Sequence, residues 1–289
     1  MTSPSRSADV EAPTVVFLHL GKTAGATMRR ILRRNVSADR VVTLRNPRSA
    51  PHGFLSMIPV EEFAARPEAE RERPRLIMAH MMYGIHEHIP RPTTYVTLLR
   101  HPVARALSGY KSARFWPEHR FHEVVAGQDM DVAAYLQSGL ALELDNSQTR
   151  AVVADTATPY GECTHEMLDR AKARIDESFS VVGVAERFDE SLLAIRRELG
   201  WRRLTYVNAN VSRRKLARSD VPAETIRMIE EQNWLDLELY RHAEARLDEN
   251  AGPALDAELD AFRRANERYK PWGTLTYTWP RRARAAVGR

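Results

Sequence analysis

One short segment near the amino terminus constrains the fold of this chain more than any other. Residues 14–20, Thr-Val-Val-Phe-Leu-His-Leu, are apolar and rich in β-branched side chains, which predicts a buried strand. A loop of small residues with one lysine, residues 21–25, follows it. A helix is expected next, because Met28, Ile31 and Leu32 share one face while arginines occupy the other. A strand, a tight loop and an amphipathic helix in this order indicate an α/β protein.

The same alternation continues along the chain. Further strands are predicted at residues 75–79, 95–99 and 180–185, and the last two lead into amphipathic helices. The first of these helices begins at Pro102, and the second ends at Gly200. These elements predict an open, mostly parallel central sheet flanked by helices.

The remaining segments are expected to decorate one domain. Residues 45–74 are rich in proline and predict a long excursion with a short helix near residues 59–65, whereas residues 222–248 are mostly helical and another short helix runs to about Tyr269. We expect a single domain over residues 13–280, a disordered tail at 1–12 and a basic tail at 281–289.

Composition excludes several classes of protein. With 43% hydrophobic and 28% charged residues among 289, the chain is neither disordered nor fibrous. Its apolar runs are far shorter than the ~20 residues of a membrane helix, and no secretory signal is evident at the start. The single cysteine, Cys163, forms no internal disulfide and no cysteine-based metal cluster, so a reducing cytoplasm is the expected compartment.

The first loop has the chemistry of an anion site. A small-residue loop that enters a helix presents backbone N–H groups and the positive end of the helix dipole, and Lys22 adds a charge there. Gly21, Lys22 and Thr23 match the end of a nucleotide-triphosphatase loop, but that motif needs a glycine where Val16 stands. The sequence therefore predicts a phosphate or sulfate cradle of a different type.

Three more residues with suitable chemistry follow predicted strands. His80 follows the strand at 75–79, Arg100 follows the strand at 95–99, and Glu186 follows the strand at 180–185. Since the carboxyl ends of parallel strands meet at one edge of a sheet, we expect these side chains to lie near Lys22. Imidazole takes a proton from an alcohol near neutral pH, so His80 is a candidate general base, the alternative being a residue that only orders a loop.

Other polar residues are weaker candidates. Gln148 and Arg150, with Asn146, are expected either to contact the acceptor or to link elements by hydrogen bonds. Arg187 is expected to contact the acceptor or to hold Glu186. His86 and His88 have no evident third metal ligand, and His19 is expected to be structural, so no metal site is predicted.

Taken together, the motifs resemble a known family. Phe-Leu-His-Leu-Gly-Lys-Thr-Ala-Gly-Ala-Thr at residues 17–27 and Leu-Leu-Arg-His-Pro-Val-Ala-Arg at 98–105, with Ser108 eight residues after Arg100, are similar to the two phosphate-binding elements of sulfotransferases that use 3′-phosphoadenosine 5′-phosphosulfate. The type that the chain resembles most is the branch of heparan sulfate 2-O-sulfotransferases and related carbohydrate sulfotransferases. The resemblance continues through residues 146–150, 181–191 and 210–212 and spans roughly residues 14–242.

The resemblance implies a role for each element. It implies that Gly21, Lys22, Thr23, Ala24, Gly25, Ala26 and Thr27 hold the 5′-phosphosulfate. It also implies that Arg100 and Ser108 hold the 3′-phosphate, that His80 is the base and that Lys22 stabilises the leaving oxygen. Ser212 and Arg213 lie in a basic loop that either closes over the 3′-phosphate or is simply solvated. Ala24 and Ala26 replace a glycine and a hydroxyl residue of the family, and Thr27 is positioned to supply that hydroxyl.

The resulting hypothesis is a metal-free sulfotransferase acting on a hydroxyl of a glycan, a small alcohol or a phenol. Membrane and nucleic-acid partners are not expected, and a bacterial source is expected because the membrane anchor of the family's Golgi members is missing. Two alternatives remain at this point. A P-loop kinase or triphosphatase would require magnesium and a strand-end acid. A non-enzymatic polyanion binder would require a continuous basic face with exposed aromatic residues, yet the arginines alternate with acidic residues throughout.

Overall fold

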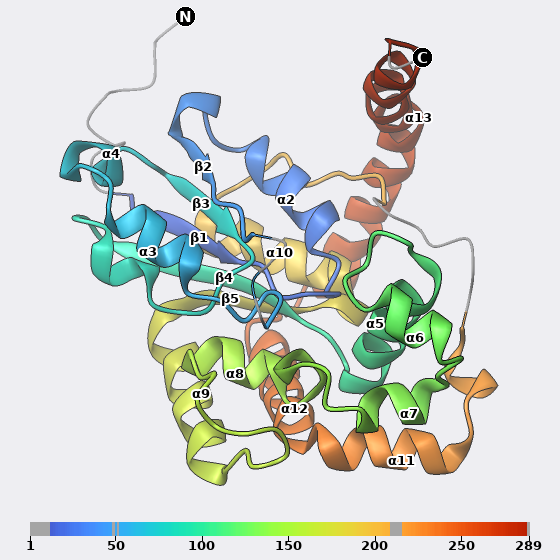
Figure 1. Cartoon of the computed structure of the whole chain (residues 1–289). Helices are drawn as coiled ribbons and strands as arrows, with labels where there is room; N and C mark the ends of the chain where they lie inside the picture. Colours follow the sequence, from blue (N-terminus) through green and yellow to red (C-terminus); the bar gives the residue numbers. More distant parts are fainter. Residues whose placement is uncertain (1–11, 48–49, 51, 209–215, 288–289) are drawn as a thin grey trace, which may run out of the picture.

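A central parallel sheet organises the chain. The structure, a computed structural model, describes residues 12–47, 50, 52–208 and 216–287 (Figure 1). Within them the sheet has five strands in the order β2-β3-β1-β4-β5, and every neighbouring pair is parallel. The strands are β1 (Thr14–Leu18), β2 (Val41–Thr43), β3 (Leu76–Ala79), β4 (Thr93–Leu99) and β5 (Phe179–Val184). The predicted fold class is therefore confirmed.

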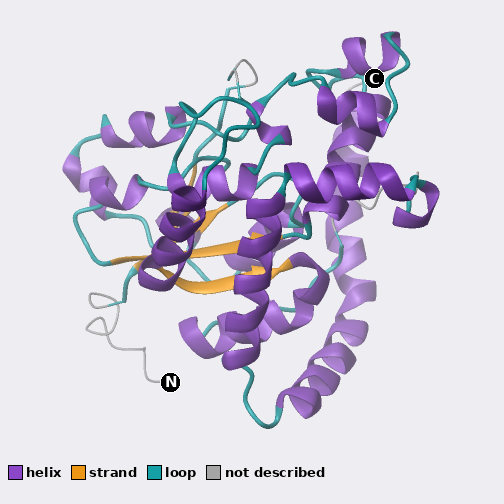
Figure 2. Cartoon of the chain, turned by 90° about the horizontal axis from the view of Figure 1, so that it is seen from below, coloured by secondary structure: helices purple, strands orange, loops and turns teal. Residues whose placement is uncertain are grey.

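Helices cover both faces of this sheet. Seen from below, the strands form a thin layer enclosed by helices (Figure 2). Figure 1 shows α2, α10 and α13 on one side, with α8, α9 and α12 on the other. The α-helices are α2 (Gly25–Arg33), α3 (Ile58–Ala64), α4 (Glu68–Glu72), α5 (Pro102–Phe115), α6 (His122–Gly127), α7 (Val132–Gln137), α8 (Ser147–Val153), α9 (His165–Ser178), α10 (Phe188–Leu199), α11 (Ala223–Gln232), α12 (Trp234–Glu249) and α13 (Leu255–Val287). Short 3-10 helices occupy Ala38–Arg40, Ile85–His88, Leu142–Leu144, Ala185–Arg187 and Arg218–Asp220.

The core has two parts. The larger part surrounds the sheet, and all five residues of β1 are buried in it. A parallel sheet covered on both faces requires such continuous apolar strands, which explains the Thr-Val-Val-Phe-Leu pattern. The smaller part lies among α5, α6, α7 and α11, where Val103, Leu107 and Tyr135 pack together. This second cluster fixes α5 at the carboxyl edge of the sheet.

Several elements differ from the expectation. The three-residue edge strand β2 and helix α4 lie in or beside the excursion for which only one short helix was predicted. The last helix, α13, does not stop near Tyr269 but continues to Val287, through most of the segment expected to be a tail. Residues 1–11 of the expected amino-terminal tail lie outside the described residues. The division into one domain and two tails therefore stays a prediction.

Close packing at Gly25 gives a test of this architecture. A Cβ atom at Gly25 would lie 1.8 Å from His19 Nε2, so alanine cannot fit unless the loop and the ring move apart. We expect Gly25→Ala to lower the free energy of unfolding by about 1–3 kcal/mol, the usual cost of overpacking. Urea denaturation followed by circular dichroism measures it.

The matched control is Gly109→Ala within α5. A Cβ atom there meets nothing within 4 Å, so alanine should raise the free energy of unfolding by roughly 0.5–1 kcal/mol through its better helix propensity. Equal effects of the two substitutions would show that the contact between Gly25 and His19 does not constrain the loop.

Candidate active site

Four predicted residues meet at the carboxyl edge of the sheet. His80 directly follows β3 and Arg100 directly follows β4, while Lys22 and Glu186 follow β1 and β5 within a few residues. Because β3, β1, β4 and β5 are adjacent in that order, the four side chains form a row along one edge. Open α/β sheets bind their ligands at this edge.

The loop after β1 has an unusual backbone. Lys22 and Ala24 both have positive φ angles, 71° and 62°, although neither is glycine, and Thr23 between them does not. This alternation directs successive N–H groups toward one side, which is the geometry of an anion-binding nest at the start of α2. Thr23 is buried, and its hydroxyl donates to the Leu20 carbonyl at 3.1 Å, which holds the turn in place. Strain of this kind persists where a site requires it.

The Lys22 amine lies in a basic environment. Its Nζ donates to Ser112 Oγ of α5 at 2.5 Å, so the loop and α5 are joined through this side chain. Partial removal of water from the amine, followed by repulsion from Arg100 and Lys111, lowers the pKa of Lys22 to about 8. An anion bound here would restore the full charge of the amine.

Arg100 connects three parts of the edge. Its Nη1 donates to the Lys22 carbonyl at 2.9 Å, and its Nε lies 3.7 Å from a carboxylate oxygen of Glu186. Its backbone is held by Gln148, which accepts from the Arg100 N–H at 2.8 Å and donates to its carbonyl at 2.9 Å. The guanidinium is therefore held at the strand end, beside the loop.

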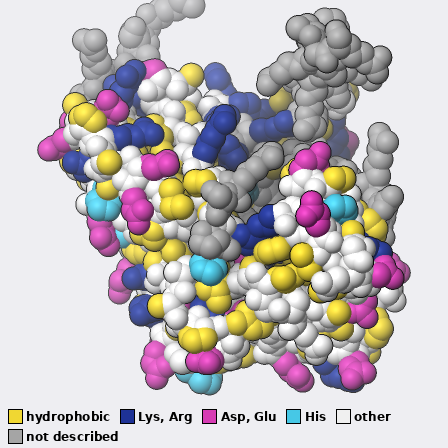
Figure 3. All heavy atoms as spheres, in the orientation of Figure 1, with side chains coloured by type: hydrophobic (Ala, Val, Ile, Leu, Met, Phe, Trp, Pro, Cys, Tyr) yellow, Lys and Arg dark blue, Asp and Glu magenta, His cyan; other side chains and the backbone are white. Residues whose placement is uncertain are grey.

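A pocket of about 310 Å³ adjoins Arg100. Ser108 lies on its wall, together with the cations Lys111 and Arg218 and the ring of Tyr240. Three cations, one acid (Glu186) and a hydroxyl suit a ligand with several negative charges. These residues fit the 3′-phosphate of a phosphoadenosine nucleotide. Figure 3 shows Lys and Arg side chains concentrated over α2 and its surroundings on this face, with acidic side chains mixed among them elsewhere.

His80 has a defined tautomer. Its Nδ1 lies 2.8 Å from the His19 carbonyl oxygen, which only accepts, so Nδ1 carries the proton and Nε2 carries the lone pair. The ring stacks on His19 with the centroids 3.7 Å apart. Burial lowers the pKa of His80 to about 4, so the ring is neutral at neutral pH. The arrangement presents a neutral imidazole with Nε2 ready to accept a proton.

Gln148 and Arg150 act between elements. Arg150 has no exposed surface, and its guanidinium donates to Asp145, Asp155 and the carbonyls of Thr158 and Pro159. Both residues belong to α8, which is wholly buried. Of the two roles that the sequence left open, the structure shows hydrogen bonding between elements, and contact with the acceptor stays a prediction.

Arg187 pairs with residues other than Glu186, and its contact with the acceptor stays a prediction. It pairs with Glu190, three residues along the chain, and with Asp248 at 2.6 Å, and it holds neither Glu186 nor the pocket wall. Glu186 is instead the partner of Arg100. Asp248 lies 61 residues away in α12, which is why sequence spacing gave no sign of the pairing.

The remaining predicted residues have other settings. His86 contacts the hydroxyl of Tyr95 through Nδ1 at 2.9 Å and so belongs to an aromatic cluster. Ser212 and Arg213 lie outside the described residues. Among the described part of the chain, no group of three or more His, Cys, Asp or Glu side chains is placed to hold a metal ion.

One histidine at this edge was not expected. His119 lines a pocket of about 110 Å³ together with Gly21, Lys22 and Glu143. Burial, followed by the nearby charges of Lys22 and Arg120, lowers the pKa of His119 to about 4. Nothing in the sequence around His119 signals this position, because it depends on how the segment after α5 folds back onto the loop.

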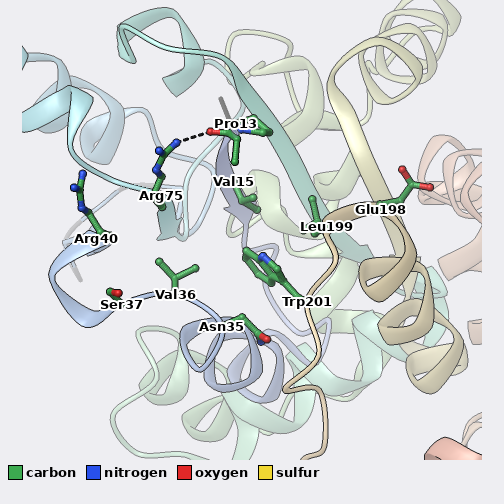
Figure 4. A pocket seen from close by; sticks show the side chains of 11 residues that line it. Pro13, Val15, Asn35, Val36, Ser37, Arg40, Arg75, Glu198, Leu199 and Trp201 are labelled. Carbon is green, nitrogen blue, oxygen red and sulfur yellow. Dashed lines mark hydrogen bonds between the residues drawn. The ribbon is translucent and has the colours of Figure 1, made fainter. Parts of the chain in front are cut away.

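A further pocket lies at the other edge of the sheet. It measures about 440 Å³ and is lined by Val15, Arg40, Arg75 and Trp201 at the amino ends of the strands (Figure 4). Arg75 donates to the carbonyl of Ala12 there, and Arg40 to that of Arg73. Because this pocket is at the opposite edge of the sheet from Lys22 and His80, it is separate from the site.

The fold and this edge define an α/β protein of the sulfotransferase class. The model of the galactose-3-O-sulfotransferase family matches residues 1–272. Galactose-3-O-sulfotransferase 3 of Homo sapiens is 30% identical over 280 residues, which cover 88% of this chain and 62% of that protein. Galactose-3-O-sulfotransferase 2 of Homo sapiens is 26% identical over 289 residues, which cover 91% and 69%. The chain belongs to the galactose-3-O-sulfotransferase family.

The comparisons refine the resemblance seen in the motifs. They support a carbohydrate sulfotransferase family of the galactose-3-O type, and the resemblance to the heparan sulfate 2-O branch stays a prediction. The chain spans about 62% of the length of the first relatives. These relatives are mammalian proteins, and the bacterial source and the cytoplasmic compartment of this chain stay predictions. Within the described residues, no helix has the length and apolar character needed to cross a membrane.

Proposed function

We propose that this protein transfers a sulfuryl group from 3′-phosphoadenosine 5′-phosphosulfate to a hydroxyl of a galactose-containing glycan. The observation that carries the proposal is the meeting of Lys22, Arg100 and His80 at one sheet edge, with Arg100 bonded to the carbonyl of Lys22 itself. A loop for the transferred group, a cation for a second phosphate and a neutral base are the three parts that such a reaction needs. The galactose acceptor is suggested by the names of the relatives.

The donor nucleotide would bridge the two basic elements. The nest between Lys22 and Ala24 would hold the 5′-phosphosulfate, and the pocket with Arg100, Ser108 and Lys111 would hold the 3′-phosphate. When bound, the donor supplies the sulfuryl group. Arg100 contributes a planar fork of N–H donors, which suits a phosphate better than a single amine does.

Each residue of the chain would have a separate task in the transfer. His80 would take the proton of the acceptor hydroxyl at Nε2, because Nδ1 is already committed to the His19 carbonyl. Lys22 would stabilise the negative charge that develops on the departing phosphate oxygen. The loop backbone would keep the reacting groups in line and exclude water.

Selective binding of the desulfated product tests the donor assignment. The protein should bind 3′-phosphoadenosine 5′-phosphate much better than adenosine 5′-monophosphate, because Arg100 and Ser108 line a pocket whose cations suit a second phosphate group. Arg100→Ala should reduce the difference by about 1.5–3 kcal/mol, the scale of a charged hydrogen bond. Isothermal titration calorimetry with both nucleotides measures it.

A surface arginine provides the matched control. Arg241 is exposed on α12 and pairs with Glu238, so Arg241→Ala should leave both affinities unchanged. Equal affinities of the wild-type protein for the two nucleotides would contradict the donor assignment.

A further inference from the structure

The pocket beside Lys22 lies on a different face of α5 from the nucleotide pocket. Arg105 and Gly109, four residues apart, face the smaller pocket, whereas Ala104, Ser108 and Lys111 face the larger one. Both pockets reach the loop edge, since Arg100 bonds the Lys22 carbonyl and Lys22 itself lines the smaller pocket. A ligand group bound at the loop edge could therefore be contacted by residues of both pockets.

His119 meets the smaller pocket in a fixed tautomer. The backbone N–H of Phe121 donates to His119 Nδ1 at 3.3 Å, so Nδ1 carries a lone pair and the proton of the neutral ring is on Nε2. The turn is held by a second bond, from the His119 N–H to the Trp116 carbonyl at 2.9 Å. With Nδ1 occupied, any polar contact of this ring with a molecule in the pocket is a donation from Nε2.

His80 and His119 therefore carry their protons on opposite ring nitrogens. His80 has its proton on Nδ1 and accepts at Nε2, whereas His119 accepts at Nδ1 and donates from Nε2. Both rings are neutral at neutral pH, since burial lowers the pKa of each to about 4. Only His80 is suited to removing a proton, and His119 is suited to holding an oxygen atom.

The rest of the pocket wall has mixed chemistry. The carboxylate of Glu143 accepts hydrogen bonds and is fixed by Arg120 at 3.1 Å. The ring of Phe54 supplies an apolar surface against the loop. Tyr135 supplies a second aromatic ring of the wall. A donor, an acceptor and aromatic rings together match a sugar, which has hydroxyl groups around its rim and apolar C–H faces.

We propose that this pocket is the acceptor subsite and that neutral His119 donates from Nε2 to an oxygen of the acceptor sugar. The inference rests on the proposed function, because it assumes a donor nucleotide in the pocket on the other face of α5. His119 would be a substrate-binding residue that reads a hydroxyl group, with no part in proton removal. Its contribution would appear in the affinity for the sugar, and nucleotide binding would be independent of it.

The test compares His119→Phe, which keeps a ring but loses the donor, with His119→Gln, which keeps an N–H donor. Initial rates are measured with methyl β-galactoside and 3′-phosphoadenosine 5′-phosphosulfate. We expect His119→Phe to raise the acceptor KM about tenfold, which is the range for one hydrogen bond. His119→Gln should bring the acceptor KM most of the way back to the wild-type value. Product-nucleotide affinity and the shape of the pH profile from 6 to 9 should not change. His122→Phe is the matched control, since His122 bonds the Ala113 carbonyl of α5 and lines neither pocket.

Each other outcome has a distinct meaning. An unchanged KM in His119→Phe, with wild-type sulfation intact, would overturn the subsite alone. If His119→Phe weakens nucleotide binding as much as it raises the acceptor KM, His119 contacts the donor. If one limb of the pH profile disappears in His119→Phe, His119 is the base. Saturation-transfer NMR of the galactoside, with the product nucleotide present, separates the two proposals. Binding that is lost in His119→Phe without any sulfation by the wild-type protein would leave the subsite standing and overturn the function. Absence of both galactoside binding and sulfation would overturn both the subsite and the proposed function.

Discussion

His80→Asn is expected to reduce turnover by at least 100-fold while nucleotide affinity stays nearly unchanged. Asparagine keeps a hydrogen-bonding side chain of related size but cannot take a proton, and a positioned general base contributes about 100- to 10,000-fold. His80→Ala should be about as inactive. Single-turnover sulfation assays, with circular dichroism to verify folding, measure both variants.

The pH dependence of turnover in the wild-type protein provides a second test of His80 as the base. Because burial lowers the pKa of His80 to about 4, the ring is basic throughout the neutral range and becomes protonated only as the pH falls through about 4. Turnover should therefore show no loss attributable to this residue between pH 6 and 8. A phenolic acceptor, which is already acidic, should suffer less from His80→Asn than an aliphatic alcohol. An active His80→Asn variant would place the base elsewhere.

Lys22→Ala is expected to reduce turnover by roughly 100- to 1,000-fold, and to weaken product-nucleotide binding by a much smaller factor. The charge on the departing oxygen develops mainly in the transition state, so the lysine should contribute there more than in the ground state. Pre-steady-state rates and calorimetric titration of the product nucleotide measure the two effects. Equal factors would make Lys22 a binding residue only.

The lowered pKa of Lys22 predicts how kcat/KM for the donor depends on pH. Its pKa is lowered to about 8 in the ligand-free protein, so the charged amine is present below that pH and is lost as the pH rises through it. kcat/KM for the donor should fall above about pH 8. Lys22→Arg keeps a charge at all accessible pH values, so any activity that it retains should lack this alkaline limb. An unchanged limb in Lys22→Arg would assign it to another group.

The strand-end residues were predictable because their positions depend on local pattern. Short apolar strands at residues 75–79, 95–99 and 180–185 are unmistakable, and parallel strands necessarily bring their carboxyl ends to one edge. His80, Arg100 and Glu186 could thus be placed together before any contact was known. Ser108 was placed at the 3′-phosphate by the family resemblance, and in the structure it lines the pocket beside Arg100.

The rest depends on contacts between distant segments. The backbone of Lys22 and Ala24 is left-handed although their residue types disfavour it, so tertiary packing decides the conformation. The pairing of Arg187 with Asp248 joins two helices far apart in sequence. β2 is a partly buried three-residue strand that exists because β3 pairs with it. His119 reaches the site through a turn that has no distinctive residue pattern.

The strand order also determines when the site can form during synthesis. β1 leaves the ribosome before its two neighbours, β3 and β4, which begin with Leu76 and Thr93. Until these strands have emerged, β1 has no partner in the sheet and the loop that carries Lys22 has no edge on which to rest. β5, whose end supplies the partner of Arg100, arrives later still, at Phe179–Val184. The loop that carries Lys22 is therefore made well before the strands that complete its edge, and a nascent chain that ends before Phe179 has the complete loop sequence without the site.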